Sequence, residues 1–174
     1  LTQQLMLRAD VMRRREAIKT FNAGSEVIKR GLALTPVKFG ISFNVNHYNQ
    51  AGAPEQIYTD RSLLVNHGGT EMGQGLNTKV AQVVAHELGL PLQRVRCSAT
   101  DTSKVANTSA TAASTGSDLN GKAAQDAAQQ LRQRLAQFWA APLGLDPQSV
   151  QFSQGRLSAA DRSIGFDEVV AQAY

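Results

Sequence analysis

The segment that decides the fold runs from Leu63 to Leu88 and has the sequence LLVNHGGTEMGQGLNTKVAQVVAHEL. It begins with a short apolar run, passes through a glycine-rich stretch and continues with apolar residues at helical spacing. This pattern predicts a strand, a loop from Gly68 to Gly75, and a helix. Gly89 follows as a residue suited to the left-handed position after a helix.

The residues before this segment predict a hairpin. Residues 56–59 and 63–65 have strand composition and flank the polar Asp60-Arg-Ser62. Pro54 lacks a backbone N–H, so the first strand of this hairpin is expected at a sheet edge or in a loop.

The first 45 residues change from a helical to a strand-like pattern. Apolar residues among polar ones from Arg8 to Asn22 predict a helix. Residues 31–34 and 37–42 then have the composition of strands, and apolar residues alternate with polar ones up to residue 46.

The C-terminal part repeats the alternation of strand and helix. Residues 95–100 predict a strand, and apolar residues from Leu119 to Phe138 predict the longest helix. Residues 86–95 and 141–150 resemble each other, and each couples a helix end to a strand. Gln154-Gly155 predicts a further hairpin.

These elements together predict an α+β fold, with mixed or antiparallel sheet layers covered by helices. We expect a helical lead-in over residues 1–28 and a β-rich core with covering helices over residues 29–174. Because both ends look cut, we interpret residues 1–174 as a fragment of a larger domain.

The composition narrows the function classes. Hydrophobic residues make up 42% and charged residues 18%, which is typical of a folded, soluble chain without a membrane span. The basic residues near the N-terminus lack interleaved aromatic residues, so nucleic acid is not expected as a partner. The single cysteine, Cys97, is interpreted as a core residue of a strand, and a cytoplasmic location is expected.

Two strand-to-helix loops are candidates for binding an anion. The first is Gly68–Gly75, and the second is Asn107-Thr-Ser-Ala-Thr-Ala-Ala-Ser-Thr115. Backbone N–H groups at a helix start attract anions, and serine and threonine hydroxyls suit a phosphate. We expect both loops to converge on one ligand and Glu71 to order the first loop by accepting backbone hydrogen bonds.

Other interpretations of the loops remain open at this point. The phosphate loop of nucleotide enzymes needs Gly-Lys-Ser or Gly-Lys-Thr, whereas Lys79 lies four residues after Gly75. Either loop also fits a plain connection between a strand and a helix. The three histidines have no metal-ligand spacing, and no nucleophile motif is present.

Several motifs together carry a family resemblance. These are Lys29-Arg-Gly31, Thr35-Pro-Val-Lys-Phe-Gly-Ile-Ser-Phe43, Asn49-Gln-Ala-Gly52, and the two loops. From about residue 21 to residue 128, the chain resembles the molybdenum hydroxylases, the family of xanthine dehydrogenases and aldehyde oxidases. Asp101-Thr-Ser-Lys-Val105 is similar to the bacterial xanthine dehydrogenase branch.

The resemblance implies part of the molybdopterin-binding domain of an enzyme that hydroxylates hypoxanthine and xanthine with water. It implies a molybdenum-molybdopterin cofactor here, and FAD and 2Fe-2S clusters in the rest of the enzyme. The implied partners are the purine substrate, the rest of the molybdenum subunit and the FAD/iron–sulfur subunit. An aldehyde oxidase or another heteroaromatic hydroxylase is the alternative enzyme, and a non-catalytic oligomerising fragment is the alternative of another class.

The resemblance also assigns site residues. Those implied to bind the cofactor are Met72, Gly73, Gln74, Ala113, Ser114 and Thr115, and those implied to bind substrate are Phe43, Asn44, Ala112 and Ala113. Asn44 stands where the family often has threonine, which puts the substrate preference in question. No catalytic residue and no direct metal ligand is expected in this chain, because the family's glutamate base lies in a segment that follows. The chain alone is therefore expected to be inactive.

Overall fold

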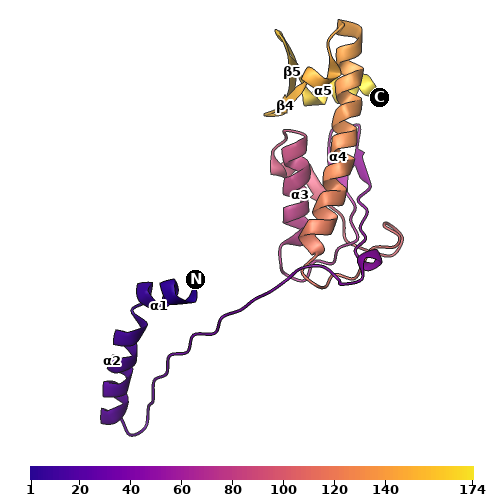
Figure 1. Ribbon diagram of the computed structural model, residues 1–174. Helices are drawn as coiled ribbons and strands as arrows, with labels where there is room; N and C mark the ends of the chain where they lie inside the picture. The colour runs from indigo at the N-terminus through magenta and orange to yellow at the C-terminus, as the bar shows by residue number, and fades with distance from the viewer. The chain divides into compact units, whose positions relative to one another are not determined.

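The computed structural model describes residues 1–174, and its strand–loop–helix segment has the form that the sequence predicts (Figure 1). β2 spans Leu63–Val65 and α3 spans Leu76–Glu87, after which Gly89 adopts a φ of 62°. The side chains of Leu76, Val80 and Val84 share one face of α3 and are each 0% exposed. The helical spacing of apolar residues therefore marks the face that enters the core.

The first sheet has the order β1-β2-β3. β1 (Glu55–Ile57) pairs with β2 in an antiparallel manner, as the predicted hairpin requires, and it lies at the edge as Pro54 predicts. β3 (Val95–Cys97) pairs in parallel with β2, and α3 supplies the crossover between these two strands. Strand β3 is shorter than the predicted residues 95–100.

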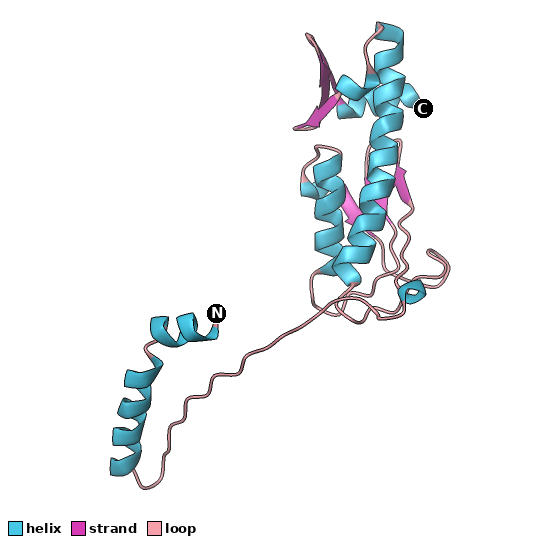
Figure 2. Ribbon diagram, viewed as in Figure 1, coloured by secondary structure: helices cyan, strands magenta, loops and turns pink.

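The longest helix, α4 (Gly116–Ala140), packs along α3 and extends from the loops to a second sheet (Figures 1 and 2). That sheet is antiparallel and has the order β4-β5-β6, with α5 after it. Gln154 and Gly155 form the predicted turn between β4 and β5, with φ values of 51° and 69°. The bounds are β4 Gln151–Ser153, β5 Arg156–Ala159, β6 Arg162–Gly165 and α5 Phe166–Ala173.

The internal repeat predicted at the two helix ends is present. Gly89 follows α3 and Gly144 follows the end of α4, with φ values of 62° and 66°. After each glycine a short 3₁₀ turn leads into a strand, β3 in the first copy and β4 in the second. The 3₁₀ turns of the chain are η1 Asn46–Tyr48, η2 Leu92–Arg94, η3 Ala141–Leu143 and η4 Pro147–Ser149.

The chain divides into two compact units, Leu1–Phe39 and Gly40–Tyr174. The first contains α1 (Thr2–Arg8) and α2 (Val11–Gly24). The sequence predicted one helix from Arg8 to Asn22, and this prediction is wrong at its start because Asp10 adopts a left-handed conformation with φ 47°. The division predicted at residue 28 concerns a larger domain and stays a prediction.

The strands predicted at residues 31–34 and 37–42 are not formed, and this prediction is wrong. A strand is stabilised by hydrogen bonds to a neighbouring strand, and no strand pairs with these residues in the structure. Instead the side-chain amide of Asn22 exchanges two hydrogen bonds of 2.8 Å with the backbone of Arg30. Ser42, with φ 75°, also departs from strand geometry.

The α+β class expected from the sequence is confirmed, since helices cover one mixed and one antiparallel sheet. The core is continuous through both sheets, because buried side chains from β2, α3, α4, β5 and α5 form one apolar cluster. None of the helices combines the length and the apolar character that crossing a bilayer would require.

Candidate functional site

The two candidate loops lie against each other, as the sequence predicts. The backbone N–H of Thr70 donates to the hydroxyl of Thr111 over 2.8 Å. A Cβ atom at Gly68 would lie only 2.1 Å from the hydroxyl oxygen of Thr108. The absence of a side chain at Gly68 therefore permits the close approach of the two loops.

The carboxylate of Glu71 organises the first loop. It accepts hydrogen bonds from the backbone N–H groups of Gly73 and Gly75 at 2.9 Å and of Asn77 at 3.0 Å. These bonds hold the pKa of Glu71 below its usual value, because they stabilise the charged form. The expected role of Glu71 is confirmed.

The side-chain amide of Gln74 closes the same loop. Its oxygen accepts from the backbone N–H of Met72 at 2.6 Å, and its nitrogen donates to the carbonyl oxygen of Thr70 at 2.9 Å. An amide nitrogen has two N–H groups, so one donor of Gln74 remains after this bond.

Left-handed backbone conformations shape the second loop. Ala113 and Ser114 have φ values of 51° and 56°, which are uncommon for residues with a Cβ atom. The carbonyl oxygen of Ala113 accepts from the backbone N–H of Ser42 at 3.0 Å. The hydroxyl of Thr115 donates to the carbonyl oxygen of Ala112 at 2.9 Å, which fixes the last turn of the loop before α4.

A buried histidine forms a hydrogen bond with the backbone of the first loop. His67 is 1% exposed, and its Nδ1 accepts from the backbone N–H of Gly69 at 3.2 Å. Its Nε2 therefore carries the proton and donates to the Asn77 side-chain oxygen at 2.9 Å. Burial lowers the pKa of His67, which keeps the ring neutral.

A cavity of about 350 Å³ lies between the loops and the starts of α3 and α4. The N–H groups of Gly116 and Ser117, in the first turn of α4, have no partner within the helix. The Lys79 ammonium adds a positive charge. The lining residues are Met72, Gln74, Leu76, Lys79, Thr111, Ala112, Ser114, Gly116 and Ser117, a set with donors and a cation but no carboxylate, which suits an anionic ligand.

The structure brings four of the predicted site residues to this cavity: Met72, Gln74, Ala112 and Ser114. Gly73 and Ala113 lie beside them in the same loops but do not line the cavity. Thr115 is 3% exposed and lies behind the second loop, where its hydroxyl is already bonded to Ala112.

The two other predicted substrate residues lie elsewhere. Phe43 lines a separate cavity of about 520 Å³ with residues 107–110, at the start of the second loop. Asn44 is exposed, and its side chain makes no hydrogen bond. The structure thus attaches Phe43, but not Asn44, to the second loop.

Sequence reasoning missed several residues of the cavity. The lining residues that were not assigned to the site are Leu76, Lys79, Thr111, Gly116 and Ser117. Lys79 carried a usable signal, because it lies one turn into the helix that follows the glycine-rich loop. Thr111 gave no such signal in the sequence, because its hydrogen-bond partner Thr70 lies 41 positions away.

The remaining reactive side chains do not form a second centre. No three His, Cys, Asp or Glu side chains gather in a group that could hold a metal ion. Cys97 is half-buried in β3, and burial raises the pKa of its thiol to about 11. This agrees with its interpretation as a core residue.

Comparison with known proteins identifies relatives of this chain. A family model described as "Molybdopterin cofactor-binding domain" matches residues 4–174. The chain is 53% identical over 123 residues to a xanthine dehydrogenase of Drosophila pseudoobscura pseudoobscura, and this alignment covers 71% of this chain and 9% of that protein. It is 50% identical over 139 residues to nicotinate hydroxylase hnxS of Emericella nidulans, and this alignment covers 79% of this chain and 10% of that protein.

A solved structure shows the same fold. Quinoline 2-oxidoreductase from Pseudomonas putida 86 superposes with a TM-score of 0.66 at 25% identity, over 71% of this chain and 16% of that one. The chain spans about a tenth of the length of the relatives that it matches.

Proposed function

Because this chain belongs to the molybdopterin cofactor-binding domain family, we propose that its two facing loops bind the pterin cofactor of a molybdenum hydroxylase. The observation that carries the proposal is the cavity that unites Met72 and Gln74 of the first loop with Ala112 and Ser114 of the second. Met72 and Ala112 are 40 positions apart in the sequence, as are Gln74 and Ser114, and the family resemblance implies contact of all four with the cofactor or the substrate.

The chemistry of the cavity fits such a group. Molybdopterin carries a phosphate, for which the helix N–H groups, the Ser114 and Ser117 hydroxyls and the Lys79 ammonium are suitable partners. The free N–H of Gln74 is left to donate to an acceptor of the cofactor. Ala112 presents only a methyl group, which leaves room for a flat ring.

The proposed reaction is hydroxylation of hypoxanthine and xanthine with water. When bound, the molybdenum cofactor supplies the oxygen transfer and accepts the electrons. This chain's residues bind and orient the reactants: Ala112, which lines the loop cavity, contacts the face of the purine. The edge-on packing of Phe43 and the contact of Ala113 with the ring stay predictions, because Phe43 lines a separate cavity and Ala113 lines neither. The family resemblance implies that the general base comes from another segment of the enzyme.

The remaining parts of the enzyme are proposed to follow the family pattern. FAD and 2Fe-2S clusters outside this chain carry the electrons onward, and the partners are the rest of the molybdenum subunit and the subunit that holds those centres. The two relatives compared by sequence above are eukaryotic, and the bacterial origin expected from residues 101–105 stays a prediction.

A nicotinate-type substrate is the second candidate. The identity to nicotinate hydroxylase, 50% over 139 residues, is close to that with xanthine dehydrogenase. Asn44 is exposed and has no hydrogen-bond partner, so it is free to contact a ring substituent. Measurement of kcat/KM for xanthine, nicotinate and an aromatic aldehyde with the intact enzyme separates the candidates, because the preferred substrate has the highest value.

Cofactor binding itself is tested by Lys79→Gln and Ser114→Ala in the intact enzyme. We expect each to lower molybdenum per chain, measured by mass spectrometry, and bound pterin, measured by fluorescence after release. Lys122→Gln and Ser153→Ala are the matched controls, because Lys122 and Ser153 do not line the cavity. Equal cofactor content in all four variants would contradict the proposal.

A further inference from the structure

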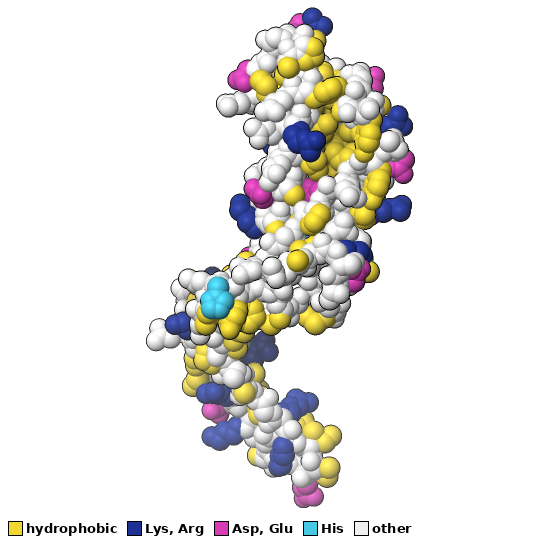
Figure 3. Space-filling model, turned by 90° about the vertical axis from the view of Figure 1, so that its right-hand side faces the viewer, with side chains coloured by type: hydrophobic (Ala, Val, Ile, Leu, Met, Phe, Trp, Pro, Cys, Tyr) yellow, Lys and Arg dark blue, Asp and Glu magenta, His cyan; other side chains and the backbone are white.

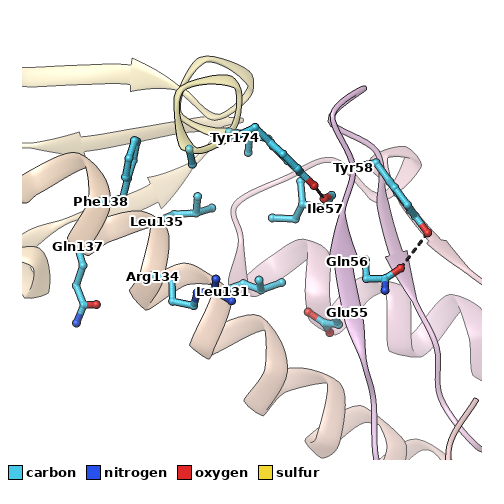
Figure 4. Close-up of a pocket in the computed structure, with 12 residues that line it drawn as sticks. Glu55, Gln56, Ile57, Tyr58, Leu131, Arg134, Leu135, Gln137, Phe138 and Tyr174 are labelled. Atoms are coloured by element: carbon cyan, nitrogen blue, oxygen red, sulfur yellow. Dashed lines mark hydrogen bonds between the residues drawn. The ribbon is translucent and has the colours of Figure 1, made fainter.

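The outer edge of β1 has unpaired backbone groups. Tyr58 donates to the Ser62 carbonyl and Asn66 donates to the Pro54 carbonyl, each over 2.9 Å. Pairing alternates along an antiparallel strand, so the backbone groups of Glu55 and Ile57 face away from β2. The N–H groups of Glu55 and Ile57 have no partner, and the Ile57 carbonyl accepts only from the Tyr174 hydroxyl (Figure 4).

A groove runs beside this edge. Its volume is about 970 Å³, and its walls come from β1, α4 and the end of α5. Figure 4 shows Leu131, Leu135 and Phe138 on the α4 side, opposite Ile57, while Tyr58 projects from the other side of β1. On the face drawn in Figure 3, hydrophobic side chains gather in the upper part of the molecule, with Lys and Arg side chains beside them.

The groove also contains a carboxyl group without a hydrogen-bond partner. Both oxygens of Glu55 are buried and make no hydrogen bond. In the sheet Glu55 lies in one row with Val65 and Cys97, on the face that the helices cover. Arg134 lines the same groove, yet it forms no ion pair with Glu55. Burying an unpaired carboxyl group is unfavourable, so a donor supplied from outside would be stabilising.

We propose that the edge of β1 is a docking site for one further strand, an extended peptide segment with alternate apolar side chains and a Lys or Arg that reaches Glu55. The backbone of the segment pairs with Glu55 and Ile57, its apolar side chains fill the groove, and its cation stabilises the ionised form of Glu55, which burial alone disfavours. A small apolar molecule would use the groove but would leave the strand edge and Glu55 unsatisfied. The inference does not depend on cofactor binding, because the cavity between the loops shares no residue with this groove.

The probe for the test is a synthetic peptide, KRGLALTPVKFGIS. It has the sequence of residues 29–42, which combines strand-like apolar residues with three cations. The control peptide has Gln in place of Lys29, Arg30 and Lys38. Each is titrated into the 174-residue chain and into its Glu55→Gln and Tyr174→Phe variants, with amide hydrogen exchange followed by NMR.

We expect the cationic peptide to slow exchange at the N–H groups of Glu55 and Ile57 by about tenfold or more at saturation. Glu55→Gln should weaken its binding about fivefold or more and leave the control peptide unaffected, because only the charged pair is removed. Tyr174→Phe should strengthen binding, since the segment no longer displaces a hydroxyl from the Ile57 carbonyl.

Unchanged exchange at Glu55 and Ile57 with peptide would overturn the proposal, as would equal loss of both peptides on Glu55→Gln. A dimeric mass without peptide, with the same two amides protected, would identify a second copy as the occupant and also overturn it. The single tryptophan, Trp139, is buried in α4, so its fluorescence verifies that each variant is folded.

Discussion

The backbone N–H of Thr70 donates to the hydroxyl oxygen of Thr111 over 2.8 Å, and this bond between residues 41 positions apart in the sequence joins the two loops. Thr111→Val keeps the shape of the side chain but removes the acceptor. We expect unfolding free energy to fall by about 1 kcal/mol and exchange at the Thr70 amide to accelerate. Urea denaturation and hydrogen exchange measure both effects. Thr102→Val is the control, because Thr102 is exposed and makes no such bond, and equal behaviour of the two variants would contradict the role of Thr111.

Glu71 should make the first loop sensitive to acid. Hydrogen bonds from backbone N–H groups lower the pKa of Glu71, because they stabilise its charged form. The carboxylate therefore keeps these bonds at neutral pH, and they are lost when it is protonated as the pH falls below about 4.5. In NMR spectra the amide signals of Gly73, Gly75 and Asn77 should titrate together in the acid range. Glu71→Gln should abolish this shared titration, and its persistence in that variant would assign it to another group.

Gly68 should tolerate no side chain while Thr108 is present. In Gly68→Ala the new Cβ atom meets the Thr108 side chain at 2.1–2.4 Å. We expect a loss of about 1–3 kcal/mol in unfolding free energy through overpacking. Adding Thr108→Gly removes all three clashing atoms and should restore part of this loss. If the double variant is less stable than the sum of the single changes predicts, the clash is not the cause.

Glu55 should make stability decrease as the pH rises. Burial raises its pKa from 4.5 to about 8, so the folded state retains a proton that the unfolded state releases. Between pH 4.5 and about pH 8 the unfolding free energy should fall by up to about 1.4 kcal/mol per pH unit. Below pH 4.5 the carboxyl group is protonated in both the folded and the unfolded chain, so this loss of stability disappears. Urea denaturation followed by Trp139 fluorescence at several pH values measures the slope.

The matched variants for that slope are Glu55→Leu and Glu26→Gln. Glu55→Leu should flatten the pH dependence and raise stability above pH 7, because it removes the buried carboxyl group. Glu26 is exposed, so Glu26→Gln should leave the slope unchanged. An unchanged slope in Glu55→Leu would exclude Glu55 as its origin.

Cys97 should be slow to alkylate. Its pKa is raised from 9.0 to about 11, so in the folded chain the reactive thiolate is about 100-fold rarer near pH 8 than at an unperturbed cysteine. The rate with iodoacetamide, compared between the native and the urea-unfolded chain, should show at least this ratio. Similar rates would mean that the thiol is freely accessible.

The parts of the fold that were predicted correctly are set by patterns among residues close together in the sequence. Residues 63–88 combine a strand, glycines and a helical repeat, and each signal is local. The hairpin at Gln154-Gly155 and the glycine ends of both long helices are local in the same sense. The expectation that the two loops converge was also correct, because both follow strands and precede helices.

The errors concern interactions that a local pattern does not contain. Residues 31–42 have strand composition, but a strand also requires a partner, and none pairs with them. The break at Asp10 is a single left-handed residue within a helical pattern. The partners of Thr111 and the unpaired state of Glu55 depend on tertiary packing, so they became visible only in the structure.

Helix α4 begins at the second loop and ends beside the second sheet, and it contributes side chains to the core along its whole length. At that far end Gly155 donates to the carbonyl oxygen of Gly89 over 2.7 Å, which ties the second sheet to the end of α3. Residues 40–174 should therefore melt in a single calorimetric transition. A truncation after residue 140 would leave every residue of the loop cavity in the chain and still remove the side chains of β5 and α5 that share the core with α4.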